Sequence, residues 1–136
     1  MTETSAETLS VVVEREMPYP PEKIWRALTQ PHLISEWLMN NNFAPVAGHR
    51  FGLSADWGGV DCEVQVVEPH KALSYTWDTK DLRSIVTWTL SPTSTGTHLK
   101  MEQTGFKPNQ QPYFQGAKAG WPHFFAALEN VLAKMD

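Results

Sequence analysis

Between residues 51 and 104 the chain alternates apolar and polar residues in five short runs, and this pattern limits the possible folds more than any other feature. The runs cover residues 51–55, 60–67, 73–78, 83–90 and 97–104. Alternation with a period of two is typical of strands that bury one face of a sheet. Because short turns rich in Gly, Pro, Ser and Asp separate the runs, we expect an antiparallel meander.

The segment before the meander predicts one further strand and two short helices. Residues 9–17 alternate in the same way and form the strand, which the prolines that follow it end. A first helix is expected at residues 21–29, because Pro21 suits a first helical turn. A second helix is expected at residues 32–38, where Pro31 restarts the chain.

The segment after the meander contains the clearest amphipathic helix. From Trp121 to Lys134 the apolar residues recur at helical spacing, and Pro122 lies near the first position of the predicted helix. Residues 105–120 contain Pro108 and Pro112, so we expect a loop or a broken helix there. The final helix is the only predicted element long enough to cover the apolar face of the meander.

This order of elements predicts an α+β fold, in which a curved antiparallel six-stranded sheet wraps around the long C-terminal helix. A twisted sheet around one helix leaves space where side chains do not meet, and that space is either filled by aromatic residues or left as a pocket. Residues 1–8 are polar and acidic, and we expect a flexible tail there, followed by one domain over residues 9–136.

Charge and composition exclude several classes of partner. The net charge is −4, and no run of Lys or Arg occurs, which argues against nucleic acid or an anionic membrane as a partner. No stretch approaches the ~20 apolar residues of a membrane helix, and the N-terminus lacks the basic start and apolar run of a signal peptide. We therefore expect a cytoplasmic protein, as a monomer or a homodimer.

No catalytic or metal-binding constellation is found in the sequence. The histidines at positions 32, 49, 70, 98 and 123 include no pair at three- or four-residue spacing, so we predict no metal and no other cofactor. There is no Gly-x-Ser-x-Gly elbow. The single cysteine, Cys62, lies on the apolar face of a predicted strand, where we expect a buried structural thiol.

The aromatic residues supply the candidate site. Trp77 and Trp88 lie on neighbouring predicted strands, and Trp121 and Phe125 face them from the last helix. These side chains form a packed core, the lining of a ligand pocket, or both. Trp57, at a hairpin tip, is either a lone exposed residue or a rim contact for a ligand or partner.

A polar residue, Arg15, shares the apolar phase of residues 11, 13 and 17. Its guanidinium either reaches solvent along the apolar stem or orients an anionic or carbonyl-bearing ligand at the pocket wall. The predicted ligand-binding residues are Arg15, Trp37, Phe51, Leu53, Val64, Tyr75, Trp77, Val86, Trp88, Met101, Trp121, Phe125 and Leu128.

A set of segments in a fixed order carries a family resemblance over nearly the whole chain. The segments are residues 15–17, 20–29, 31–38, 48–51, 59–60, 63–64, 69–77, 86–90, 96–99, 104–106 and 120–121. Together they resemble the AHSA-like family, named after an activator of a heat-shock chaperone ATPase, within the START-like (SRPBCC) superfamily. The resemblance implies the helix-grip fold, which hosts ligand carriers, polyketide cyclases and chaperone activators.

One primary hypothesis and two alternatives follow. The primary hypothesis is that a small hydrophobic or aromatic molecule binds between the sheet and the last helix, without assignable catalysis. The first alternative is an interaction protein that modulates a chaperone. The family's eukaryotic chaperone activators carry an additional N-terminal domain absent here, so we expect no strong activation by this domain alone. The second alternative is a cyclase- or hydrolase-like enzyme, which requires titratable side chains that converge in the cavity.

Overall fold

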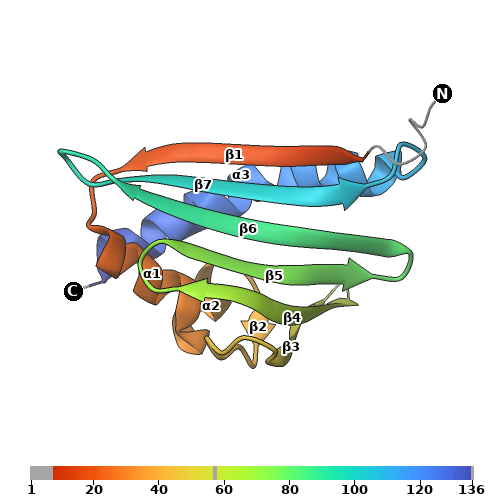
Figure 1. The fold of residues 1–136 in the computed structure, drawn as a ribbon, viewed down its shortest axis with the longest axis horizontal. Helices are drawn as coiled ribbons and strands as arrows, with labels where there is room; N and C mark the ends of the chain where they lie inside the picture. The colour runs from red at the N-terminus through yellow and green to blue at the C-terminus, as the bar shows by residue number, and fades with distance from the viewer. Residues whose placement is uncertain (1–7, 57, 136) are drawn as a thin grey trace.

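Helices and strands follow one another along the chain in the predicted order (Figure 1). The structure, a computed structural model, describes residues 8–56 and 58–135. Residues 1–7 of the expected tail and Trp57 therefore lie outside the described residues. The elements are β1 (Leu9–Met17), α1 (Pro21–Thr29), α2 (Pro31–Trp37), β2 (Asn40–Asn41), β3 (Arg50–Ala55), β4 (Gly58–Glu68), β5 (Ala72–Thr79), β6 (Leu82–Pro92), β7 (Thr97–Phe106) and α3 (Gln111–Lys134).

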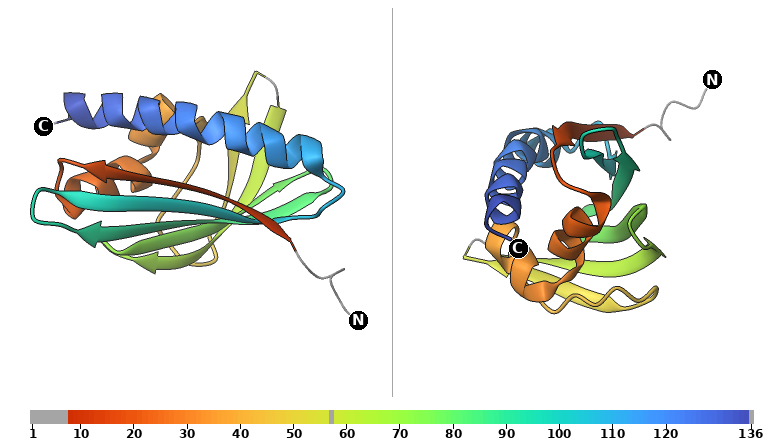
Figure 2. Two further views of the ribbon diagram at one scale, coloured as in Figure 1. Left: turned by 90° about the horizontal axis from the view of Figure 1, so that it is seen from above. Right: turned by 90° about the vertical axis from the view of Figure 1, so that its left-hand side faces the viewer.

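Among the described residues, the sheet has seven strands in the order β1-β7-β6-β5-β4-β3-β2, each antiparallel to its neighbours. The predicted α+β class and curved antiparallel sheet are confirmed. The strand beyond the expected six is β2, whose two residues pair with Leu53 and Ser54 of β3. Two residues are too few to show a period of two in a sequence. Figure 2 shows the sheet curling from β1 round to β3, with α3 along its concave side.

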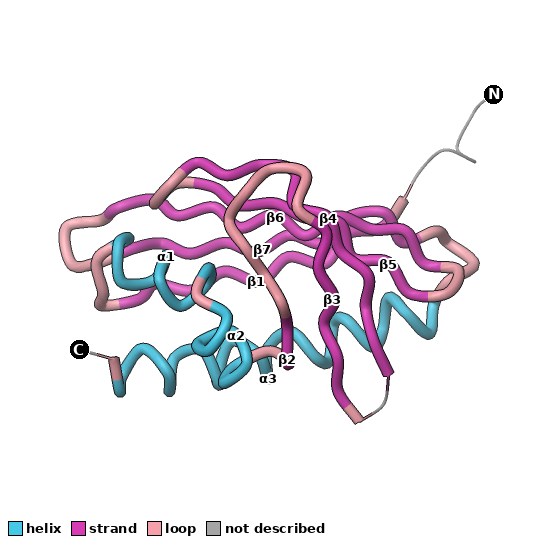
Figure 3. Tube along the Cα trace, turned by 90° about the horizontal axis from the view of Figure 1, so that it is seen from below, coloured by secondary structure: helices cyan, strands magenta, loops and turns pink. Residues whose placement is uncertain are grey.

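The two short helices close one end of the space between the sheet and α3. The predicted bounds of α1 are confirmed, and this helix buries Ile24 and Leu28. α2 begins at Pro31, one residue before the predicted start. Trp37 is buried and donates a hydrogen bond of 2.8 Å from its indole nitrogen to the carbonyl oxygen of Ala27, which fixes α2 against α1. Figure 3 shows both helices beside the C-terminal half of α3, whose N-terminal half extends past them.

The expected loop or broken helix over residues 105–120 is wrong from Gln111 onward, because α3 begins there. Pro112 lies in the first turn of α3, where a backbone N–H has no partner within the helix, so the proline removes nothing. Pro122 lies inside the helix rather than at its start. The helix continues through Pro122 without the hydrogen bond that residue 122 would donate to the carbonyl of Lys118.

Tertiary packing stabilises the N-terminal half of α3 against unfavourable helix propensity. Gly116 and Gly120 each lower helix stability by about 1 kcal/mol relative to Ala. Against this cost, the ring of Phe114 lies 5.7 Å from the ring of Phe106 on β7. Phe106 is fully buried, so this contact anchors the start of α3 to the sheet.

Trp88 of β6 lies at the centre of the core and is fully buried. The Phe125 ring stacks on it at 5.6 Å between ring centroids, and Trp37 and Trp121 approach it edge-on at 5.6 and 5.8 Å. Its indole nitrogen donates a hydrogen bond of 3.0 Å to the hydroxyl of Tyr75. The core is therefore filled with aromatic side chains at this level, and a cavity lies beside the N-terminal half of α3.

Candidate functional site

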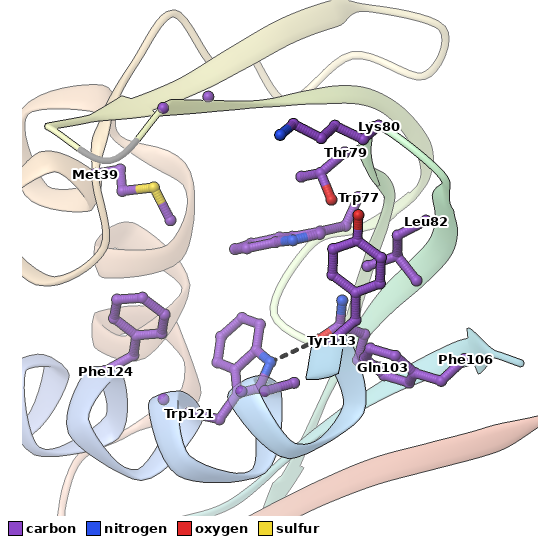
Figure 4. Close-up of a pocket in the computed structure, with 15 residues that line it drawn as sticks. Met39, Trp77, Thr79, Lys80, Leu82, Gln103, Phe106, Tyr113, Trp121 and Phe124 are labelled. Atoms are coloured by element: carbon purple, nitrogen blue, oxygen red, sulfur yellow. Dashed lines mark hydrogen bonds between the residues drawn. The ribbon is translucent and has the colours of Figure 1, made fainter. Parts of the chain in front are cut away.

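A cavity of about 480 Å³ lies between the N-terminal half of α3 and the strand ends that face it (Figure 4). The helix side of its wall comes from positions 113, 116, 117, 120, 121 and 124. These positions recur at intervals of three and four residues, so they form one face of the helix. The opposite side comes from β4, β5, β6 and β7, from Lys80 in the turn between β5 and β6, and from Met39 between α2 and β2.

Three small residues on the cavity face of α3, Gly116, Ala117 and Gly120, create the open volume. In the C-terminal half of the helix the core-facing positions carry large side chains such as Phe125 and Leu128, which fill the space. Beyond its own turns of helix, a Cβ atom added at Gly116 or Gly120 would have no described atom within 4 Å. The cavity therefore exists because these positions carry no side chain or only a methyl group.

Two tryptophans and a buried amide form the deep end of the cavity. The rings of Trp77 on β5 and Trp121 on α3 lie 5.3 Å apart, tilted by 54°. Gln103 of β7, 1 % exposed, accepts a hydrogen bond of 2.8 Å from the indole nitrogen of Trp121. Its amide nitrogen donates to the hydroxyl of Ser84 at 3.0 Å, and that hydroxyl donates to the carbonyl of Trp77 at 2.6 Å.

This hydrogen-bonded chain fixes the two tryptophans and leaves capacity for a ligand. A glutamine amide offers two N–H donors and two lone pairs on its oxygen. Gln103 uses one of each with partners among the described residues. By this count one N–H and one lone pair remain on a residue that lines the cavity. A ligand with a hydroxyl or carbonyl group at its inner end would satisfy them.

The charged side chain of the described cavity lining lies at the rim of the cavity. Of the described residues that line the cavity, Lys80 alone is charged at neutral pH. Tyr113 is the other titratable lining residue among them. General acid–base catalysis requires titratable groups positioned together at the reacting atoms. Among the described lining residues, the titratable side chains are this exposed lysine and one phenol.

The structure places the predicted ligand-binding residues in two groups. Trp77 and Trp121 line the cavity. The other ten apolar or aromatic residues are buried in the core and lie outside the cavity lining: Trp37, Phe51, Leu53, Val64, Tyr75, Val86, Trp88, Met101, Phe125 and Leu128. Whether any of these residues affects ligand binding stays a prediction.

Arg15 lies on the exposed part of β1, away from this cavity. Its guanidinium lies 5.7 Å from the centre of the Phe125 ring, and it donates a hydrogen bond of 2.8 Å to the carbonyl of Glu14. The guanidinium therefore packs over the face of an apolar ring and keeps its charge at the surface.

Sequence reasoning missed the residues that shape the cavity, above all Gly116, Gly120 and Gln103. Two signals pointed to them. Gln103 continues the inward phase of Leu99 and Met101, and a polar residue at an apolar phase requires a partner or a ligand. The glycines at 116 and 120 fall on the same face as Trp121, at helical spacing.

Cys62 and the possible metal ligands take no part in the cavity. Cys62 is buried, as predicted. Burial raises the pKa of its thiol, and the carboxylates of Asp78 and Asp61 raise it further, so the thiol stays protonated and unreactive. Within the described residues, no three His, Cys, Asp or Glu side chains gather closely enough to hold a metal ion.

Among the residues that the structure describes, no helix is both long and apolar enough to cross a membrane.

His98 forms a separate charged cluster between β7 and β1. Its Nε2 lies 2.7 Å from a carboxylate oxygen of Glu14, and its Nδ1 contacts a carboxylate oxygen of Glu16. The hydrogen bonds with Glu16 and then Glu14 raise the pKa of His98 above its ordinary value of 6.5. The protonated imidazole thus joins the first strand of the chain to the last.

We expect this cluster to make stability depend on pH. Because the pKa of His98 is raised in the folded state, its contribution is fully present below about pH 6.5 and is lost as the pH rises through the folded pKa. Urea unfolding at a series of pH values should show this loss in the wild type, and His98→Gln should abolish it. Equal pH slopes in the two proteins would contradict the assignment.

The fold and the cavity define the class of protein. A curved antiparallel sheet that holds a long C-terminal helix, with two short helices after the first strand, is the helix-grip architecture of the START-like superfamily. The chain matches the family described as activator of Hsp90 ATPase homolog 1-like protein over residues 18–133. It belongs to this family, which confirms the resemblance seen in the sequence.

Solved structures support the same assignment. Protein MLL2253 from Mesorhizobium loti is 61 % identical, with a TM-score of 0.92 over 94 % of this chain and 99 % of that one. BH1534 from Bacillus halodurans is 26 % identical, with a TM-score of 0.81 over 92 % and 98 % of the two chains. DynU16, a protein in the dynemicin biosynthetic locus, is 25 % identical, with a TM-score of 0.83 over 92 % of this chain and 47 % of that one. A search of curated proteins gives no match.

Proposed function

We propose that the protein binds a small hydrophobic or aromatic molecule in the cavity beside the N-terminal half of α3. The observation that carries this proposal is the open volume of about 480 Å³ between Trp77 and the helix face that bears Gly116 and Gly120. This volume lies within the range of about 300–1,000 Å³ typical of small-molecule sites. The lining is mostly apolar, and its polar side chains are those of Gln103 at the deep end and of Thr79, Lys80 and Tyr113.

The cavity matches a flat, partly aromatic ligand. Trp77 and Trp121 offer ring faces, and Phe106 and Phe124 add apolar surface to the wall. Gln103 supplies a fixed hydrogen-bonding group at the deep end, which orients a molecule that carries one polar atom there. A place for DynU16 in a biosynthetic locus is compatible with a small-molecule role in this family.

The two alternatives receive less support from the structure. Among the described residues, the large exposed apolar side chains are Val12, Val46, Val66 and Ile85. Val12, Ile85 and Val66 stand on β1, β6 and β4, which are not neighbouring strands, and Val46 stands on the loop before β3. Single apolar residues spaced in this way are normal on a protein surface and give little support to a docking surface for a chaperone. An enzyme would need an acid and a base within reach of one substrate atom, and the described lining residues offer no such pair.

The test is a titration with N-phenyl-1-naphthylamine, a neutral aromatic dye that fluoresces in apolar surroundings. We expect saturable dye fluorescence together with quenching of tryptophan emission, because Trp77 and Trp121 line the cavity. Protein unfolded in urea is the control and should show neither signal. Native mass spectrometry of freshly purified protein shows first whether a tightly bound molecule already fills the site. If the protein is free of such a molecule and still gives no saturable response when folded, the proposal is wrong.

A further inference from the structure

We infer that the ligand is an anion: its aromatic part fills the cavity, and its negative group lies at the mouth against Lys80. This inference rests on the proposed function and names the chemical class of the ligand. An aromatic or polycyclic carboxylate, sulfonate or phosphate has this character. The argument depends on charge, on backbone conformation and on a second hollow beside the mouth.

A basic groove adjoins the mouth of the cavity. We define it by three cationic side chains, those of Lys80, Arg83 and Lys107, with Asp81 as the one acidic residue among its described lining. The groove shares the lining residues Lys80 and Tyr113 with the cavity, so the two hollows lie side by side at these residues. The whole chain carries a net charge of −4, whereas the groove beside the mouth carries more positive than negative side chains.

The Lys80 ammonium is available to a ligand. Within the described residues, the salt bridges join Arg26 to Glu22, Arg50 to Glu63, and His98 to two glutamates, and none involves Lys80. Figure 4 shows the Lys80 side chain along the rim above Trp77. An anion at this point would gain a charged partner without displacing one from the protein.

The backbone at Lys80 gives an independent indication. Lys80 has a φ of 41°, in the left-handed region that favours glycine or asparagine. A lysine in this conformation costs of order 1 kcal/mol, and such strain clusters at functional sites. The Arg83 guanidinium donates to the carbonyl oxygens of Lys80 at 2.8 Å and Leu82 at 2.9 Å, which holds the turn in place. The strained turn therefore presents a lysine to the mouth where a smaller residue would be easier to accommodate.

Two dyes with the same aromatic framework test the inference. The dye 8-anilino-1-naphthalenesulfonate carries a sulfonate that N-phenyl-1-naphthylamine lacks. We expect Lys80→Met to weaken binding of the sulfonate dye about fivefold, which is the upper range for a solvent-exposed ion pair. Binding of the neutral dye should change by less than about twofold, since the methionine keeps the apolar stem. Lys80→Glu should weaken binding of the sulfonate dye further. In the wild type, added salt should weaken binding of the sulfonate dye but not of the neutral dye.

The matched control is Lys118→Met. Lys118 lies on α3 but outside the cavity lining, and its ammonium is 5.3 Å from the centre of the Phe114 ring. The Lys118→Met variant changes the net charge by the same amount as Lys80→Met, and it should leave the binding of both dyes unchanged. If both dyes bind but the two lysine variants behave alike, the anion inference is wrong while the proposed function stands. If neither dye binds the wild type, the proposed function fails, and the inference fails with it.

Discussion

Replacing Gly120 with Phe is expected to abolish dye binding in the cavity while the protein stays folded. Gly120 lies on the cavity face of α3, and beyond its own turns of helix a Cβ atom there would have no described atom within 4 Å. A phenylalanine side chain would therefore enter the open volume and occupy the place of the ligand. We expect the affinity for N-phenyl-1-naphthylamine to fall at least about tenfold, equivalent to about 1.4 kcal/mol.

The same substitution should raise stability. Glycine is among the least favourable residues inside a helix, and most other residues improve helix propensity by a few tenths to about 1 kcal/mol. Burial of the new ring against Trp77 and Trp121 adds to this gain. Thermal unfolding should show a higher Tm for Gly120→Phe, so a loss of binding would not result from unfolding.

Ala119→Phe is the control for Gly120→Phe. Ala119 is the adjacent residue on α3, but it is exposed and lies outside the cavity lining. The variant adds the same ring to the same helix on another face, and we expect wild-type dye affinity. If Gly120→Phe binds the dye as tightly as Ala119→Phe, the dye binds elsewhere and the cavity is not the site.

The two glycines also explain why the sequence predicted the fold better than the site. Alternation in the strands and the spacing of Phe125, Leu128 and Leu132 report large side chains that pack, so they predict elements and core. A cavity is made by positions that lack side chains, and Gly116 and Gly120 contribute nothing to a hydrophobic period. The large aromatic residues expected at the site mostly fill the core because they fit together there.

The start of α3 was missed for a related reason. Pro112, Gly116 and Gly120 all lower intrinsic helix propensity, and local sequence therefore predicts a loop or a broken helix. The helix forms there because Phe114 packs on Phe106 and Trp121 packs on Trp77, contacts between residues that are not neighbours in the sequence. Such contacts become visible only once the sheet is assembled.

Trp88→Ala is expected to destabilise the fold by about 3–5 kcal/mol, the usual cost of removing a large aromatic side chain from a core. Trp88 is fully buried among Trp37, Trp121 and Phe125, so its removal leaves a cavity that these rings cannot close. It also removes the donor to the Tyr75 hydroxyl, a group buried in the same core. A loss of this size is a large fraction of the roughly 5–15 kcal/mol that stabilises a typical domain.

Trp77→Ala provides the contrast on the neighbouring strand. Trp77 borders the existing cavity, so its removal enlarges a space that is already open and costs fewer packing contacts than removal of Trp88. We expect the smaller loss of stability from Trp77→Ala and the larger loss of dye affinity, because its ring faces the ligand. Urea unfolding and dye titration of both variants measure the two effects separately. Should Trp88→Ala cost no more stability than Trp77→Ala, the division between a filled core around Trp88 and an open site beside Trp77 would be wrong.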